Sequence, residues 1–217
     1  ESGMNRRQFL QATAAAGAGL AFSPLLSRAW AAGSEKRPNI VFVFSDQHQF
    51  RATGCYGESQ VKTPNFDAVA AQGARCAGIS TSPLCVPYRA SLIAGEYASH
   101  TNLLVNMSRK RRVPLYGKRE HRNFGTQFKQ AGYATAYIGK HHLPLSPAEL
   151  GFDYWALTAS HHDYTKWNIS TSDKKRLTGK GFKTDGVTDV ALEYLRGHKD
   201  KPFCMVMSWG PRHSPFR

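Results

Sequence analysis

The sequence is poor in acidic residues and in cysteine, and it contains no long apolar run. Fifteen Asp and Glu residues stand against 29 Lys and Arg, so the formal net charge is +14, and the four cysteines show no Cys-x-x-Cys spacing. This cysteine pattern argues against a zinc site and against a dense disulfide framework. No apolar run reaches the ~20 residues that a membrane-spanning helix needs, so we expect no stable membrane anchor.

The basic excess is concentrated in three short runs, at residues 109–112, 118–122 and 174–176. Two interpretations stay open: a surface that binds a polyanion, or solvated loops whose charge is balanced by an acidic remainder of the protein. Aromatic residues are not interleaved with these runs and no nucleic-acid-binding motif is present, so nucleic acid is not an expected partner. With 41% hydrophobic residues, the chain can bury one sizeable core.

Residues 1–32 have the composition of a signal peptide. Arg6 and Arg7 precede an Ala- and Gly-rich apolar stretch, and Ala29-Trp-Ala31 is a small-x-small cleavage signal. The arginine pair resembles the twin-arginine type, which implies the twin-arginine export machinery and a periplasmic or secreted protein. The alternative is an ordinary first helix with two surface arginines. The absence of acidic residues between Met4 and Gly33 weighs against it.

Apolar runs alternate with helical patterns in the rest of the chain. We expect strands at 38–44, 75–80, 133–138 and 203–208, and helices at 65–72, 86–93, 124–131 and 187–196. Strands separated by helices predict an α/β fold with a mainly parallel sheet flanked by helices. The first run is apolar at every position, so we expect that strand to be central in the sheet and buried on both faces.

Three candidate site residues follow expected strands directly. Asp46 comes after the first strand, Lys140 after the strand at 133–138, and His213 after the strand at 203–208. Because the carboxyl ends of parallel strands meet at one edge of a sheet, we expect these three side chains to lie close together.

Cys85-Val-Pro-Tyr-Arg89 resembles the Cys-x-Pro-x-Arg signature of type I sulfatases. The resemblance implies that a maturation enzyme oxidises Cys85 to formylglycine, whose hydrated aldehyde is the nucleophile, and that Arg89 belongs to the catalytic set. A helix start suits this position, because unpaired N–H groups and the helix dipole attract an anion such as a sulfate ester. Taken alone, a lone cysteine such as Cys85 is more commonly a buried structural thiol than a reactive one.

Ser45-Asp46-Gln47 resembles the family's first pair of metal ligands. Oxygen donors of this kind suit a hard divalent cation such as Ca²⁺, which Asp46, Gln47 and the modified Cys85 would bind. Many members have Asp-Asp here, and Asp-Gln occurs in a branch with phosphonate and choline-ester enzymes. Without the family, an Asp at a strand end is usually a helix cap or a turn residue.

Gly139-Lys-His-His142 resembles the family's Gly-Lys-x-His motif. Lys140 would bind a sulfate oxygen as a point charge. His142 would accept the proton from the nucleophile, since the pKa of histidine lies near neutrality. His141 is expected to be a surface residue.

Two further residues belong to the expected site. His213 lies in a segment that resembles the family's Pro-x-His-x-Pro, which places a histidine near the leaving group. Asn106 matches a later asparagine that would contact the ester oxygens of the substrate. A loop-capping role for Asn106 remains an equal alternative.

The resemblance runs from residue 38 to residue 215 and implies an alkaline-phosphatase-like fold. We expect residues 37–217 to be the N-terminal portion of a sulfatase catalytic domain that is incomplete at its C-terminus, because no Asp is followed by Asn or His to give the second ligand pair, and a second lysine is missing. Such a chain should be inactive alone.

The function implied is hydrolysis of a sulfate ester, and the basic surface and export make a sulfated carbohydrate the candidate substrate. The alternatives are hydrolysis of phosphonate monoesters or phosphodiesters, favoured by Gln47 and Asn106, and a non-catalytic polyanion-binding module.

Overall fold

The protein is described by a computed structural model that covers residues 37–57, 60–78, 80, 82–106, 122–160, 163–210 and 213. The strands are β1 Ile40–Ser45, β2 Ala134–Gly139, β3 Tyr154–Thr158, β4 Lys166–Thr171, β5 Arg176–Lys180 and β6 Phe203–Trp209. The helices are α3 Pro64–Gln72, α4 Cys85–Ala94, α5 Ala98–Thr101, α6 Phe124–Gln130 and α7 Lys183–His198, with short 3-10 turns η1 Phe50–Ala52 and η2 Gly54–Tyr56. None of the described helices combines the length and the apolar character that crossing a membrane requires.

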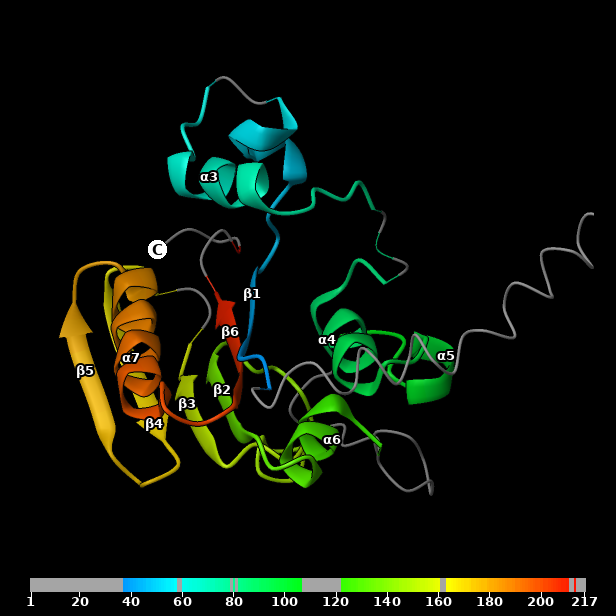
Figure 1. Ribbon diagram of the computed structural model, residues 1–217, viewed down its shortest axis with the longest axis vertical. Helices are drawn as coiled ribbons and strands as arrows, with labels where there is room; N and C mark the ends of the chain where they lie inside the picture. The colour runs from blue at the N-terminus through cyan, green and yellow to red at the C-terminus, as the bar shows by residue number, and fades with distance from the viewer. Residues whose placement is uncertain are drawn as a thin grey trace, which may run out of the picture. The chain divides into compact units, whose positions relative to one another are not determined.

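The strands form one mixed sheet in the order β1-β6-β2-β3-β4-β5 (Figure 1). β1, β6, β2 and β3 are parallel neighbours, whereas β4 and β5 are antiparallel and form a hairpin at the far edge. The carboxyl ends of β1, β6 and β2 therefore meet at one edge of the sheet, where ligand sites of such folds lie.

The alternation of side chains along β2 and β6 gives the sheet two apolar faces. On one face, Ile138 and Met205 pack with the buried side of α7. On the other, Tyr137 and Val206 pack with Val86 and other residues of α4. Figure 1 shows α7 on one side of the sheet and α4 and α6 on the other. The expected α/β fold with helices on both faces is confirmed.

Most of the expected elements are present. The four expected helices correspond to α3, α4, α6 and α7, and three of the expected strands correspond to β1, β2 and β6. α7 begins four residues earlier than the sequence predicted, at Lys183. The strand expected at 75–80 is wrong, because none of the described residues of that range is in a strand.

The central position expected for β1 is also wrong. β1 is an edge strand of the described sheet and pairs there with β6 alone. Val41 and Val43 are 47% and 42% exposed, while the alternate residues Phe42 and Phe44 pack toward α4. The apolar run predicted burial on both faces, but α7 packs on β2, β4, β5 and β6 and does not cover β1.

Candidate active site

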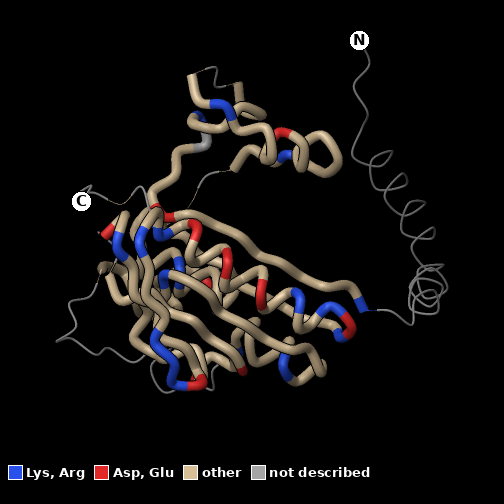
Figure 2. The backbone as a smooth tube through the Cα atoms, turned by 90° about the vertical axis from the view of Figure 1, so that its left-hand side faces the viewer, with Lys and Arg blue, Asp and Glu red and all other residues tan. Residues whose placement is uncertain are grey.

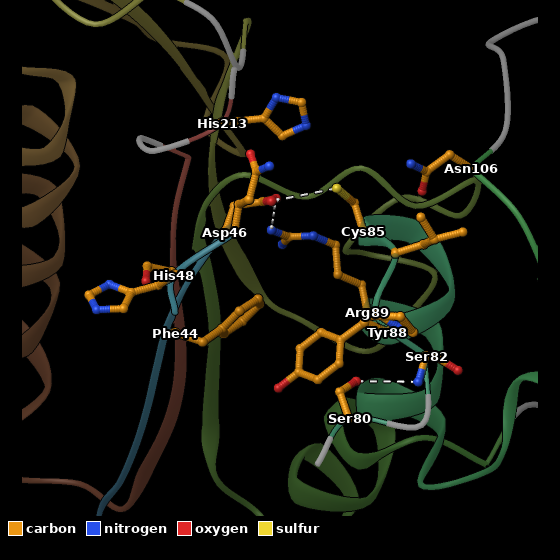
Figure 3. A pocket seen from close by; sticks show the side chains of 14 residues that line it. Phe44, Asp46, His48, Ser80, Ser82, Cys85, Tyr88, Arg89, Asn106 and His213 are labelled. Carbon is orange, nitrogen blue, oxygen red and sulfur yellow. Dashed lines mark hydrogen bonds and ion pairs between the residues drawn. The ribbon is translucent and has the colours of Figure 1, made fainter. Parts of the chain in front are cut away.

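Side chains from separate segments converge at the carboxyl edge of β1, β6 and β2. The thiol of Cys85, the first residue of α4, donates to Oδ1 of Asp46 at 3.5 Å. The ammonium group of Lys140 lies 2.5 Å from Oδ2 of Asp46 and 3.8 Å from Sγ of Cys85. Figure 3 shows Cys85 between Asp46 and Asn106, with His213 nearby. The expectation that Asp46, Lys140 and His213 lie close together at this edge is confirmed.

Asp46 and Cys85 line a cavity of about 490 Å³, whereas Lys140 lies behind Asp46 and is not one of the lining residues. Most of its lining residues come from the end of β1, from the segment before α4 and from α4 itself. Asn106, which follows α5, and His213, which follows β6, complete the lining. The cavity is large enough for a small-molecule substrate group.

Arg89 connects four elements beneath the Cys85–Asp46 pair. Its Nη2 donates to Oδ2 of Asp46 at 3.0 Å, and its Nη1 donates to the backbone oxygen of Lys140 at 2.6 Å and to Oγ of Ser208 at 2.8 Å. The guanidinium also lies 4.9 Å from the ring centroid of Phe44. Since Arg89 is only 2% exposed, its donors are used to fix α4 against the three strand ends.

Two buried cations share one buried carboxylate. Lys140 is fully buried, Arg89 is 2% exposed and Asp46 is 7% exposed. Burial opposes ionisation of Asp46, but the hydrogen bond and charge of Lys140, followed by those of Arg89, outweigh it and hold the pKa of Asp46 below its usual 3.8. The three side chains together carry one excess positive charge, which attracts an anionic group into the cavity.

The thiol of Cys85 is held in its protonated form. Burial is the largest influence and raises the pKa of Cys85 above its usual 9.0, the charge of Lys140 opposes this effect, and Asp46 adds to it. A thiol with a raised pKa is a poor nucleophile near neutral pH.

Gly139 lets Lys140 leave the end of β2 at the required angle. Gly139 has φ of 105°, and a Cβ at this position would lie 2.0 Å from the backbone oxygen of Ser208. Only glycine combines this conformation with so close an approach to a neighbouring strand.

The two histidines after Lys140 differ from the sequence interpretation. His141 is not a surface residue: it is 8% exposed, and its ring packs edge-on against Tyr137 at 4.9 Å. Burial and the charge of Arg89 lower the pKa of His141 to about 3. For His142, burial and then the charges of Lys140 and Arg89 lower the pKa to about 4, not the near-neutral value that we expected. Both imidazoles are therefore neutral at pH 7.

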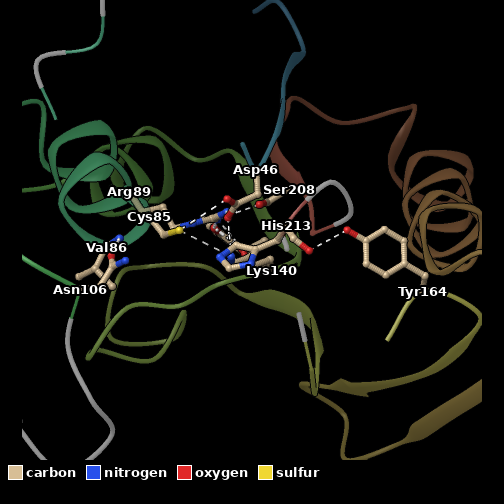
Figure 4. Close-up of polar contacts among 10 residues, drawn as sticks. Asp46, Cys85, Val86, Arg89, Asn106, Lys140, Tyr164, Ser208 and His213 are labelled. Atoms are coloured by element: carbon tan, nitrogen blue, oxygen red, sulfur yellow. Dashed lines mark hydrogen bonds and ion pairs between the residues drawn. The ribbon is translucent and has the colours of Figure 1, made fainter. Parts of the chain in front are cut away.

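Asn106 caps the N-terminus of α4. Its Oδ1 accepts the backbone N–H of Val86 at 3.0 Å, whereas Leu84, the N-cap residue, has no side-chain acceptor (Figure 4). An acceptor from elsewhere in the chain thus satisfies one of the free N–H groups beside Cys85. The capping alternative is confirmed, while a contact of Asn106 with substrate stays a prediction.

His213 is tied to the chain segment before β4. The hydroxyl of Tyr164 donates to the backbone oxygen of His213 at 2.8 Å (Figure 4). Sequence reasoning missed Tyr164, Tyr137 and Ser208, and no motif marked them. The hydroxyl residue Ser208 near the end of an otherwise apolar strand was the one available signal.

Two site residues have left-handed backbone conformations. Gln47 has φ of 55° and His142 has φ of 57°, and each follows a strand end by two or three residues. Non-glycine residues rarely adopt this region, and where they do they often belong to functional sites.

The donor set near Asp46 is suitable for a cation. Asp46, Cys85 and His213 each offer a possible ligand atom, and these atoms lie within 4.8 Å of one another. Gln47 lines the same cavity and has an amide oxygen. A carboxylate and an amide fit the preference of a hard cation for oxygen.

Several expectations lie outside the described residues. They concern the signal peptide at 1–32, the basic run at 109–112 and most of the run at 118–122.

Comparisons with known proteins agree with this geometry. The family model described as Sulfatase matches residues 38–217, and the model of the twin-arginine translocation pathway signal sequence matches residues 3–23. That signal directs export, to the periplasm or beyond.

The similar proteins are sulfatases. The N-acetylglucosamine-6-O-sulfatase of Bacteroides thetaiotaomicron is 35% identical over 177 residues, which cover 79% of this chain and 30% of that protein. The ulvan-active sulfatase of Formosa agariphila is 34% identical over 191 residues, which cover 82% of this chain and 36% of that protein.

A solved structure, described as a complex with its substrate D-glucosamine-2-N,6-O-disulfate, superposes with a TM-score of 0.70 at 33% identity, over 82% of this chain and 35% of that chain. The chain thus spans about a third of the length of these relatives. The mixed sheet flanked by helices is the alkaline-phosphatase-like fold of these neighbours, and the chain belongs to the sulfatase family.

Proposed function

We propose that this chain supplies the nucleophile and much of the sulfate-binding site of an exported enzyme that hydrolyses sulfate esters. The observation that carries the proposal is the cluster at the N-terminus of α4. There, Sγ of Cys85 lies 3.5 Å from Oδ1 of Asp46 and 3.8 Å from Nζ of Lys140. Hydrolysis breaks the bond between sulfur and the ester oxygen, consumes one water molecule and releases an alcohol and sulfate.

Cys85 is the residue that becomes the nucleophile. When a maturation enzyme has converted it to formylglycine, the hydrated aldehyde supplies a hydroxyl for attack on sulfur and a second hydroxyl whose deprotonation expels the sulfate. Burial raises the pKa of the unmodified Cys85 thiol, so that side chain is not itself poised to react as a thiolate.

Asp46, Gln47 and the group derived from Cys85 would hold a divalent cation, with Ca²⁺ the best match to oxygen donors. The cation would supply charge compensation for the sulfate oxygens and would orient the nucleophile. The fit rests on the chemistry of the donors and on the short distances among the side chains of Asp46, Cys85 and His213.

The remaining side chains act on charge and protons. Lys140 binds a sulfate oxygen, and the excess positive charge of the buried cluster favours an anionic ester. His142 accepts a proton from the nucleophile; its lowered pKa leaves the imidazole unprotonated at pH 7 but makes it a weaker base than an ordinary histidine. His213, whose backbone oxygen accepts a hydrogen bond from Tyr164, would assist the departing alcohol oxygen. Arg89 acts by holding Asp46 and α4 in place.

A sulfated carbohydrate is the substrate class that we favour. Two relatives are named for N-acetylglucosamine-6-O-sulfate and for ulvan, and a similar solved structure holds a glucosamine disulfate. The named relatives are sulfatases and do not favour the phosphonate alternative.

The test uses the full-length protein produced together with a formylglycine-generating enzyme. Mass spectrometry of the peptide that contains Cys85 should show the loss of mass from thiol to aldehyde, and the protein should release sulfate from an aryl sulfate. Cys85→Ala, with its fold checked by circular dichroism, should be inactive. Full activity with an unmodified thiol would contradict the proposal, and so would hydrolysis of aryl phosphonates in preference to aryl sulfates.

A further inference from the structure

The β4–β5 hairpin has a strongly basic composition. Residues 166–180 contain five Lys and Arg residues and one acidic residue, Asp173. Asp173 forms an ion pair with Lys175 at 2.7 Å, so it does not neutralise the rest. Figure 2 shows Lys and Arg in blue at both ends of this hairpin.

The basic residues share one face of the hairpin. Trp167, Ile169 and Leu177 pack toward α7. Because side chains alternate along a strand, Lys166, Arg176 and Lys180 point to the opposite face, and all three are exposed. Asn168, Ser170 and Thr178 lie between them on that face. We call these six residues the hairpin face.

The pairing register places like charges opposite each other. Lys166 is directly opposite Lys180, and Arg176 is opposite Ser170. Two lysines opposed in this way repel one another. Among the described residues, none of the ion pairs involves Lys166, Arg176 or Lys180, so their charge is available to an anion from outside the chain.

One end of the hairpin face lies at the edge of the sheet that carries the active site. β4 runs antiparallel to β3, so Lys166 and Lys180 lie at the edge where the parallel strands end. Tyr164, two residues before Lys166, contacts the backbone of His213. The hairpin face therefore begins beside the proposed site, and from Lys180 to Arg176 it extends about 13 Å along the strand.

We propose that the hairpin face binds a linear sulfated polysaccharide, and thereby selects polymeric over small sulfate esters. This inference extends the proposed function to units of the substrate beyond the one that reacts. The basic side chains match sulfate groups, and Asn168, Ser170 and Thr178 offer hydrogen bonds to hydroxyl groups. Nucleic acid fits less well, because the hairpin face has no aromatic side chain on which a base could stack. A membrane surface fits less well too, because that face has no apolar side chain.

The test compares two double variants of the full-length matured enzyme. Lys166→Gln/Lys180→Gln removes two charges from the hairpin face, whereas Lys199→Gln/Lys201→Gln removes two exposed charges beyond α7, at the edge of the sheet where β6 begins. At low salt, the first variant should bind heparin chains about fivefold to tenfold more weakly. Its kcat/KM on a sulfated polymer should fall similarly, with hydrolysis of a small aryl sulfate unchanged. The control should stay within about twofold of the wild type.

Arg176→Gln gives an independent measurement at the far end of the hairpin face. It should weaken binding of long heparin chains but leave a disaccharide unaffected, since only a long chain reaches Arg176. Equal losses in both double variants, or no loss in the first, would overturn the proposal, as would a larger loss for anionic lipid vesicles than for heparin. Because binding is measured separately from sulfate release, failure of the hairpin face and failure of the proposed activity remain distinguishable.

Discussion

The ammonium group of Lys140 lies 2.5 Å from the carboxylate of Asp46, and both side chains are buried. Arg89 reaches the same carboxylate oxygen at 3.0 Å. The single negative charge of Asp46 therefore serves as counter-ion to two buried cations. Lys140 and Arg89 share that one counter-ion between them. The two partners of the Lys140–Asp46 pair are consequently not equivalent, and their removal should have different effects.

We predict that Asp46→Ala destabilises the protein by about 3–5 kcal/mol, since it leaves two buried cations without a counter-ion. Lys140→Ala should cost less, because Arg89 still neutralises Asp46. Both variants should lower kcat by about 100-fold or more. Urea unfolding measures the stabilities. The matched control is Lys129→Ala, which breaks the half-exposed pair with Asp153 and should cost less than about 1 kcal/mol. If Lys140→Ala lost more stability than Asp46→Ala, the prediction that Asp46 is the more important partner would be wrong.

Stability should fall as the pH is lowered from about 6.5 to 4. The folded pKa values of His141 and His142, about 3 and about 4, lie below the unfolded value of 6.5. The unfolded chain therefore binds more protons in this window, and protonation favours unfolding. Below pH 4, protonation of Asp46 removes a further contribution, because its folded pKa is also lowered. Urea unfolding at pH 7, 6 and 5 measures the slope, and a flat profile would refute this prediction.

Replacing His141 tests its share of that slope. Nε2 of His141 is buried and has no hydrogen-bond partner among the described residues. His141→Phe keeps an aromatic ring against Tyr137 and removes the unpaired polar atom, so we expect a gain of about 1–2 kcal/mol at pH 7 and a shallower pH dependence. His100→Gln, an exposed position on α5, serves as the control. A loss of stability in the Phe variant would show that Nε2 has a partner.

Much of this site follows from simple rules applied to the sequence. Continuous apolar runs predicted β2 and β6, and the rule for parallel strand ends brought together Asp46, Lys140 and His213. The start of α4 was predicted at Val86, one residue after its observed start at Cys85, because a first helical turn tolerates Pro87. These features are local, or depend on one topological rule.

The missed features depend on which segments pack together. The alternation of polar and apolar residues at 166–170 is typical of a strand, but the run at 176–180 has Leu177 as its only large apolar residue, so the two runs do not indicate a hairpin before their packing on α7 is known. The apolar run of β1 could not show that one of its faces is open. Burial of His141 depends on its contact with Tyr137, and the Gly-Lys-x-His pattern does not indicate that contact.

The cap on α4 predicts separate effects of two substitutions at Asn106. Asn106→Ala leaves the N–H of Val86 without its acceptor and should cost about 1 kcal/mol of stability, with a lower kcat because Cys85 is less well fixed. Asn106→Asp keeps an acceptor and should retain stability, but its negative charge beside the cavity should raise KM for a sulfate ester. If the Ala variant kept full stability while its KM rose, contact with substrate would be the main role of Asn106. In that case the Asp variant, like the Ala variant, should keep full stability and have a raised KM.

The supply of oxygen donors leads to a prediction about metal binding. Ca²⁺ takes six to eight oxygen ligands, whereas the described site offers the carboxylate of Asp46 and the amide of Gln47 beside Cys85 and His213. We therefore expect the 217-residue chain alone to bind Ca²⁺ no more tightly than millimolar and to release no sulfate. The full-length protein should lose activity with a chelator and recover it with Ca²⁺. Isothermal titration calorimetry with Ca²⁺ compares the 217-residue chain with the full-length protein, and Asp46→Ala is the control. Micromolar binding or turnover by the short chain would show that its own donors complete the shell.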